Sequence, residues 1–281
     1  PELFGDWALT RVLRGCGGSV EKASEWLQRM ISNMETFHVD ELYLEMVAKL
    51  EENRDCPFGK ASMLMHSEEI EPYVNEIFHH PKPTTSGDLL NYFAFCDINN
   101  QGILDNVEWE HFVQYHRSAT ILRMIALDRQ SRATNRMAKT VWIGDLKGCP
   151  LSNLTNAEFS KKFQADVSSF QEIVSAEVMR RMYIVNGPWW AVRLWKTFQG
   201  LIPEGVRRKF HVLDGAGLED EDFVELVGGK ALLQQMLLSR KGLVDTSAQA
   251  SSTQQISIAR RAAFDYSLGV QAAYGLGIAC A

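Results

Sequence analysis

One stretch of the sequence carries oxygen-bearing side chains at the spacing of a calcium-binding loop. The loop positions one, three, five, six, nine and twelve are filled by Asp97, Asn99, Gln101, Gly102, Asp105 and Glu108. Such a loop holds Ca²⁺ through side-chain and carbonyl oxygens, with the glycine making the sharp turn. No second loop accompanies it, because the 214–225 stretch has Glu219 where the glycine should be. A calcium-regulated adaptor is kept as an alternative, while the main expectation includes no metal and no cofactor.

A second stretch concentrates tryptophan directly after the turn Asn186-Gly187-Pro188. Its aromatic side chains are Trp189, Trp190, Trp195 and Phe198. The apolar residues cover more than one helical face, and tryptophan is favoured where a protein meets the surface of a membrane. Arg193 and Lys196 lie on the same segment and could reach lipid phosphates. The pattern therefore indicates a helix that meets lipid; the alternative is that these aromatics form ordinary core.

Enzyme signatures are missing from the sequence. The glycine-rich stretches 15–18 and 214–217 lack the spacing that places backbone amides around a phosphate. No nucleophile elbow or His-Glu-x-x-His helix is found, and the five cysteines include no Cys-x-x-Cys pair. We therefore expect a protein that is not an enzyme and holds neither a disulfide framework nor a zinc site.

Composition narrows the class of protein further. The chain has 281 residues, 46% of them hydrophobic, and a net charge of −6. This describes a folded protein, and the acidity argues against one that coats nucleic acid, which needs a basic surface. The uncharged 266–281 stretch is too short to span a bilayer. Because Pro1 is not a natural start, we expect the chain to be part of a longer protein.

The elements that must position these residues alternate along the chain. A helical region runs from Leu9 to Lys49 and a loop-rich region follows, in which the adjacent histidines His79 and His80 are expected in solvent. Residues 107–136 return to helical periodicity. Beyond them the pattern predicts strand 139–145, helix 157–180, strand 182–185 and strand 209–213. Strand, helix, strand, helix, strand predicts a mainly parallel α/β sheet with right-handed connections.

The same pattern divides the chain into four parts. We predict a helical subdomain at 1–58, the sheet domain at 59–240, a linker at 241–254 that is rich in serine, threonine and glutamine, and a partial β module at 255–281. The last assignment rests on apolar side chains that alternate at period two around Ile256 and Phe264.

Three motifs in this order resemble the CRAL-TRIO lipid-binding family. They are the stretches 13–23, 140–148 and 183–188, the last being Tyr-Ile-Val-Asn-Gly-Pro, with the tryptophan-rich helix directly behind it. The resemblance covers about residues 8–230, and the β module resembles the start of a GOLD domain. It implies a sheet-floored pocket for one phospholipid, covered by a movable gate helix, to which Trp189, Trp190, Trp195 and Phe198 would belong.

The resemblance also implies where the lipid headgroup binds. In members that bind phosphatidylinositol, a glutamate before the 183–188 motif and a lysine at the next strand contact the headgroup, and Glu177 and Lys209 occupy those places. The alternatives are a surface ion pair of Glu177 with Arg181 and a solvated Lys209. Ser152 and Asn153 are further polar candidates. Val178 replaces the usual arginine after the glutamate, which puts a phosphatidylcholine-type second ligand in doubt.

The sequence thus predicts a monomeric, cytoplasmic protein that binds a phospholipid, most of all phosphatidylinositol, and transfers or presents it at membrane surfaces. The alternative from another class is a scaffold that recruits proteins to membranes without transfer. No nucleic-acid partner is expected.

Overall fold

The computed structural model of the chain describes residues 2–150, 153, 156–189, 192, 193, 195, 204–213 and 215–242. Helices and strands alternate after an all-helical start, as predicted. In chain order the elements are α1 Asp6–Gly15, α2 Val20–Thr36, α3 Val39–Glu52, η1 Ala61–Met63, α4 Ser67–Ile70, β1 Val74–Ile77, β2 Leu89–Ile98, α5 Asn100–Asn106, α6 Trp109–Thr134, β3 Thr140–Asp145, α8 Ala157–Phe163, η2 Gln164–Ser168, α9 Ser169–Val174, β4 Met179–Val185, α11 Glu204–Arg207, β5 Phe210–Val212, α12 Glu221–Val227 and α13 Lys230–Leu238.

The sheet has five strands in the order β1-β2-β3-β4-β5. Strand β1 pairs antiparallel with β2, and the other pairs are parallel. Each parallel strand is added beside the previous one, so right-handed connections place all the linking segments on the same face. Contacts agree, because the guanidinium of Arg123 on α6 lies 4.8 Å from the ring centre of Trp142 on β3. The prediction of a mainly parallel α/β fold is confirmed.

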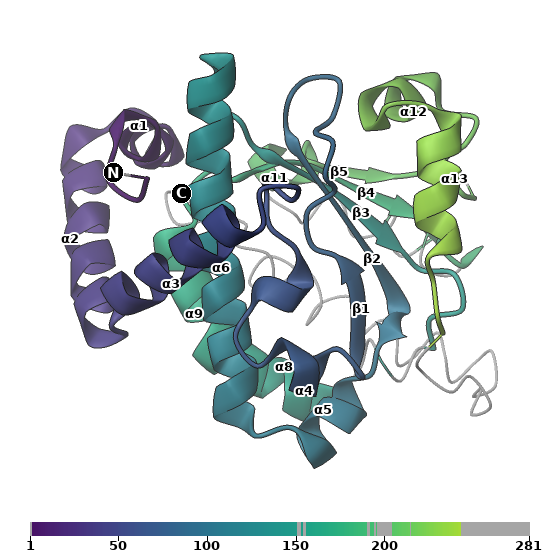
Figure 1. The fold of residues 1–281 in the computed structure, drawn as a ribbon. Helices are drawn as coiled ribbons and strands as arrows, with labels where there is room; N and C mark the ends of the chain where they lie inside the picture. The colour runs from purple at the N-terminus through teal and green to yellow at the C-terminus, as the bar shows by residue number, and fades with distance from the viewer. Residues whose placement is uncertain are drawn as a thin grey trace.

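The opposite face of the sheet is covered by α12 and α13 (Figure 1). Alternate residues along each strand face the two sides. On β2, Leu90, Tyr92 and Ala94 pack with Phe223 of α12 and Met236 of α13. The residues between them, Phe93 and Phe95, face the α6 side with Trp142.

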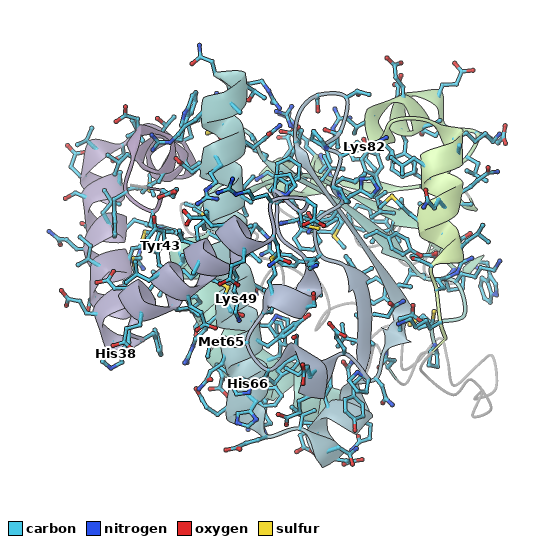
Figure 2. The ribbon with its side chains drawn as sticks, in the orientation of Figure 1. His38, Tyr43, Lys49, Met65, His66 and Lys82 are labelled. Atoms are coloured by element: carbon cyan, nitrogen blue, oxygen red, sulfur yellow. The ribbon has the colours of Figure 1, made fainter. Side chains whose placement is uncertain are left out.

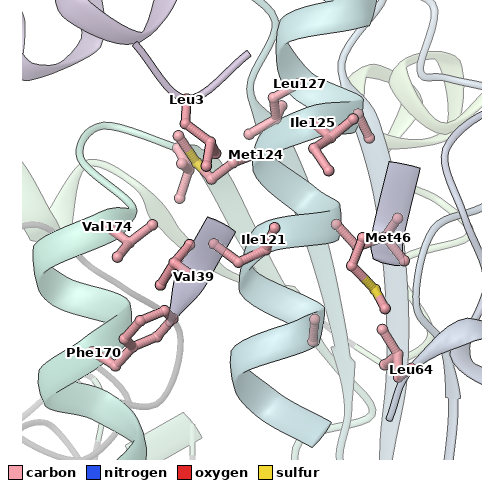
Figure 3. Packing of buried hydrophobic residues seen from close by; sticks show 14 of the residues in the cluster. Leu3, Val39, Met46, Leu64, Ile121, Met124, Ile125, Leu127, Phe170 and Val174 are labelled. Atoms are coloured by element: carbon pink, nitrogen blue, oxygen red, sulfur yellow. The ribbon is translucent and has the colours of Figure 1, made fainter. Parts of the chain in front are cut away.

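Helix α6 lies between the N-terminal helices and the sheet (Figure 1). Its side chains Ile121, Met124 and Ile125 pack against Val39 and Met46 of α3, with Phe170 and Val174 of α9 nearby (Figure 3). Of the 26 residues in α6, 16 are buried. The apolar residues of α6 therefore recur at steps of three and four residues, but they cover more than one face of the helix.

The helical start follows its sequence signals. The side chain of Ser19 accepts a hydrogen bond of 3.3 Å from the backbone N–H of Lys22 and so caps α2. Met30 and Met34 of α2 are buried, whereas Val20 at its start is 69% exposed. The domain boundary at residue 58 stays a prediction. The predicted linker and GOLD-like module lie outside the described residues from position 243 onward.

Two local predictions were wrong. The helix expected to reach Arg180 ends at Val174, because Ser175 leaves helical geometry and the chain enters β4 at Met179. His79, expected in solvent, is 4% exposed and hydrogen-bonded through Nδ1 to the carbonyl oxygen of Phe58. Burial is the main cause that lowers the pKa of His79 to about 3. Polar neighbours in the sequence concealed that the residue follows the short strand β1.

The calcium-loop prediction also fails in the structure. Asn99 accepts a hydrogen bond of 2.9 Å from the N–H of Gly102 and caps helix α5, so the stretch is a helix and not a loop. Gln101 and Asp105 hydrogen-bond each other on that helix at 2.8 Å. Asp97 lies in β2, where its carboxylate accepts backbone N–H groups of Lys241 and Gly242. The oxygens are therefore committed elsewhere and do not converge on an ion.

Among the helices in the described part of the chain, a search finds none with the length and apolar content needed to cross a bilayer.

Candidate functional site

Two lysines and a glutamate meet at the amino ends of three adjacent strands. Lys139 directly precedes β3, Glu177 stands two residues before β4, and Lys209 directly precedes β5. Because these strands are parallel neighbours, their amino ends share one edge of the sheet. Glu177 binds Lys139 through Oε2, and its Oε1 lies 3.3 Å from Nζ of Lys209. The structure thus brings together the two residues singled out in the sequence.

The charges of this cluster shape its chemistry. Burial works to raise the pKa of Glu177, but the hydrogen bond from Lys139 and the charges of both lysines outweigh it and hold the pKa below its ordinary value. Burial is the main cause that lowers the pKa of Lys139. One carboxylate faces two ammonium groups, so the cluster favours an additional anion. Its side chains are between 17% and 25% exposed, so such a group can reach them.

The N-terminal helices reach this cluster through the end of α1. A Cβ at Gly15 would lie 3.5 Å from Cγ of Glu177, and the charge of Arg14 contributes to the lowered pKa of Lys139. Glu177 itself has a positive φ of 52°, a conformation that non-glycine residues adopt at some energetic cost. The backbone before β4 is thus held so that this carboxylate points to the lysines.

The surface alternatives considered for these residues do not hold. Glu177 pairs with Lys139 and Lys209, while Arg181 donates a hydrogen bond of 3.1 Å to the hydroxyl of Tyr183. Lys139 was missed in the sequence analysis. A signal existed: a lysine at the first position of a predicted strand lies near the residues that precede the neighbouring parallel strand. Asn153 donates to the carbonyl oxygen of Phe95 at 2.8 Å, and Ser152 lies outside the described residues.

The apolar side of the sheet adjoins the cluster. Phe93, Phe95, Trp142 and Met182 are buried there, and Ile184 and Phe210 pack partly against them. Gly144 leaves room for these rings, since a Cβ at this position would lie only 3.2 Å from Phe93 and from Phe95.

The tryptophan-rich segment begins as a helix over this apolar surface. The N–H of Val192 donates to the carbonyl oxygen of Pro188 at 3.3 Å, as in a first helical turn. The ring of Trp195 lies 5.8 Å from that of Phe210, whereas Trp189 is 60% exposed. Trp190 and Phe198, also predicted for this helix, lie outside the described residues. One tryptophan thus contacts the sheet face and another meets solvent.

The start of this segment is held by the buried carboxylate of Asp145, at the carboxyl end of β3. Asn186, with a positive φ of 53°, donates from Nδ2 to Oδ1 of Asp145 at 2.9 Å. The same carboxylate accepts the hydroxyl of Tyr92 and the N–H of Lys147, each at 2.9 Å, and pairs with Arg240. The carboxylate that holds the turn before the tryptophan-rich segment is therefore itself held by three other groups.

Comparisons with known proteins found two similarities. Residues 77–234, more than half of the chain, match the model of the CRAL/TRIO domain. Among solved structures the chain is similar to the crystal structure of Sfh5, with a TM-score of 0.49, 11% sequence identity, and coverage of 94% of this chain and 83% of that one. No curated protein matches the chain.

Proposed function

Because this chain belongs to the CRAL/TRIO family, whose members bind lipophilic ligands and are not enzymes, we propose that its ligand is phosphatidylinositol and that it transfers or presents this lipid at membrane surfaces. The observation that carries the proposal is the meeting of Glu177 with Lys139 and Lys209 beside an apolar sheet face. A single site of this kind can take a charged head and aliphatic tails together.

The headgroup assignment is supported by the hydrogen bonds and ion pairs that these side chains can form with a lipid. The carboxylate of Glu177 can accept hydrogen bonds from ring hydroxyls, and the ammonium groups can pair with a phosphate. Binding would replace the present ion pairs with charge-assisted bonds to the lipid. The next residue, Val178, is 1% exposed and apolar, so it offers no charge to a second type of headgroup. This favours phosphatidylinositol over phosphatidylcholine.

The chain topology couples the headgroup to the proposed gate. The segment 186–209 must connect the carboxyl end of β4 with the amino end of β5. It therefore begins at Asn186, which Asp145 holds, and ends at Lys209 in the cluster. We infer that the segment is the gate: Trp189 would enter the membrane surface first, and movement there would pull on a residue that contacts the headgroup. The protein would act as a monomer in the cytoplasm.

Mass spectrometry of an organic extract of the purified protein tests the ligand. We expect phosphatidylinositol at about one molecule per chain, because lipid in an apolar site is retained through purification. Another phospholipid at that ratio would contradict the headgroup assignment and leave lipid binding in place. Protein that carries no lipid and transfers none between vesicles would favour the scaffold alternative.

The gate assignment predicts an effect of Trp189→Ala on membrane binding. Loss of an exposed indole should weaken binding to phospholipid vesicles about tenfold or more, since a tryptophan side chain buries more than ~150 Å² of apolar surface. Co-sedimentation with vesicles measures this. The matched control is Leu238→Ala, which removes an apolar side chain that is 81% exposed on α13, behind the opposite face of the sheet. Equal vesicle binding by the two variants would contradict the assignment.

A further inference from the structure

Two histidines and a glutamate cluster where the segment before α4 meets the start of α6. His66, Glu69 and His111 each offer one ligand atom, and these atoms lie within 4.8 Å of one another. Nδ1 of His111 lies 2.7 Å from Oε2 of Glu69, and Nε2 of His111 lies 3.4 Å from Oε2 of Glu108. The cluster thus consists of two pairs, His66 with Glu69 and Glu108 with His111, each spaced by three residues.

The backbone holds the two pairs against each other. Glu108 is the cap of α6, and its N–H donates to Oε1 of Glu69 at 3.3 Å. His66 caps α4 in the left-handed conformation, with φ of 55°. The side chains of His111 and Glu69 are 32% and 36% exposed, so solvent ions can reach them. Figure 2 shows His66 beside the lower part of α6, away from the sheet.

Imidazole nitrogens and carboxylate oxygens in this ratio are the ligands that zinc takes in proteins, with bonds of about 2.0–2.2 Å. Ligand atoms on one tetrahedral zinc are then roughly 3.3 Å apart. The present distances lie on both sides of this value, since Nδ1 of His111 is 2.7 Å from Oε2 of Glu69 and all the ligand atoms lie within 4.8 Å of one another. The rings of His66 and His111 are stacked with centres 3.9 Å apart. They must rotate out of the stack to aim both nitrogens at one ion, which half-exposed side chains can do.

We propose that His66, Glu69 and His111 form a binding site for a divalent transition metal ion such as Zn²⁺, with water as the fourth ligand. The ion joins the η1–α4 segment to the first turn of α6. This site is separate from the lipid cluster: α6 is 26 residues long, about 39 Å, and Lys139 lies beyond its other end.

The test is a titration of the tag-free, chelator-treated full chain with ZnCl₂ by calorimetry, and with CoCl₂ by visible absorption. We expect one ion per chain, tetrahedral Co²⁺ bands, and a rise in melting temperature with Zn²⁺. His66→Asn keeps a residue suited to the left-handed conformation. This variant and His111→Gln should each weaken binding about 100-fold or more, because even changes to residues that only hydrogen-bond to metal ligands cost about 10–100-fold.

His38→Asn is the matched control, because His38 is also a left-handed helix cap but lies at the start of α3, away from the cluster (Figure 2). It should bind Zn²⁺ like the unchanged chain. Glu69→Gln gives a second, nearly isosteric variant if either histidine variant fails to fold. Absence of stoichiometric Zn²⁺ binding, or equal affinity in His66→Asn, His111→Gln and His38→Asn, would overturn the proposal. Lipid content measured in the same samples should not change.

Discussion

The double replacement Glu177→Ala and Lys209→Ala should lower phosphatidylinositol transfer between vesicles by at least about tenfold, and by about 100-fold if both contacts are fully formed. Each hydrogen bond to a charged group contributes about 1.5–3 kcal/mol, and a factor of ten in affinity corresponds to about 1.4 kcal/mol. Because the double variant removes both side chains of the 3.3 Å contact, neither is left without the other. The measurement is transfer of labelled phosphatidylinositol from donor to acceptor vesicles.

The matched control is a second glutamate and lysine pair on another part of the surface. Nζ of Lys230 lies 2.9 Å from Oε1 of Glu219, and both side chains are at least half exposed. Glu219→Ala with Lys230→Ala removes the same two residue types and should leave transfer unchanged. Lys139→Ala alone should reduce transfer, because Lys139 bonds the other oxygen of Glu177. Full transfer by the Glu177 and Lys209 variant, with its fold intact, would refute the headgroup assignment.

The largest effect on stability is expected for Asp145→Ala. The carboxylate is fully buried, and its removal leaves the hydroxyl of Tyr92, the amide of Asn186 and the charge of Arg240 without their acceptor. Removal of one partner from a buried ion pair costs about 3–5 kcal/mol. Urea denaturation followed by circular dichroism should show a corresponding drop in the free energy of unfolding.

Asp105→Ala is the control for this experiment. Asp105 is exposed on α5 and accepts one hydrogen bond, from Gln101. Its replacement should change the free energy of unfolding by less than about 0.5 kcal/mol, as is usual for surface positions. Similar urea midpoints for the two variants would show that the Asp145 network contributes little to the fold.

Much of the fold could be predicted from the sequence, because buried residues recur with the period of the helix or strand that contains them. Strand β3 and helix α6 were predicted nearly at their observed bounds, since each carries a run of buried residues. The end of α9 was misplaced because Ala176, Val178 and Met179 continue an apolar pattern after the helix has stopped. An apolar pattern shows only that residues are buried, and these residues are buried where the chain enters β4.

The candidate site was likewise predicted only in part. Glu177 and Lys209 were found through a family resemblance, and their contact follows from the pairing of β4 with β5. Lys139 was missed because its partner stands 38 residues later in the sequence. The calcium loop was a false match, because the side chain of Asn99 accepts a hydrogen bond from the N–H of Gly102 and caps helix α5. The spacing of oxygen-bearing residues alone does not distinguish a calcium loop from a capped helix.

The sequential strand order has a consequence for how the chain assembles during synthesis. Each new parallel strand can join the free edge left by its predecessor, so no strand has to be inserted between two that have already paired. Two buried carboxylates, Asp97 and Asp145, receive their last partners only from residues 240–242. In a nascent chain that has not yet released this segment from the ribosome, both carboxylates therefore lack part of their partners, and the segment after α13 completes the hydrogen bonding of the domain.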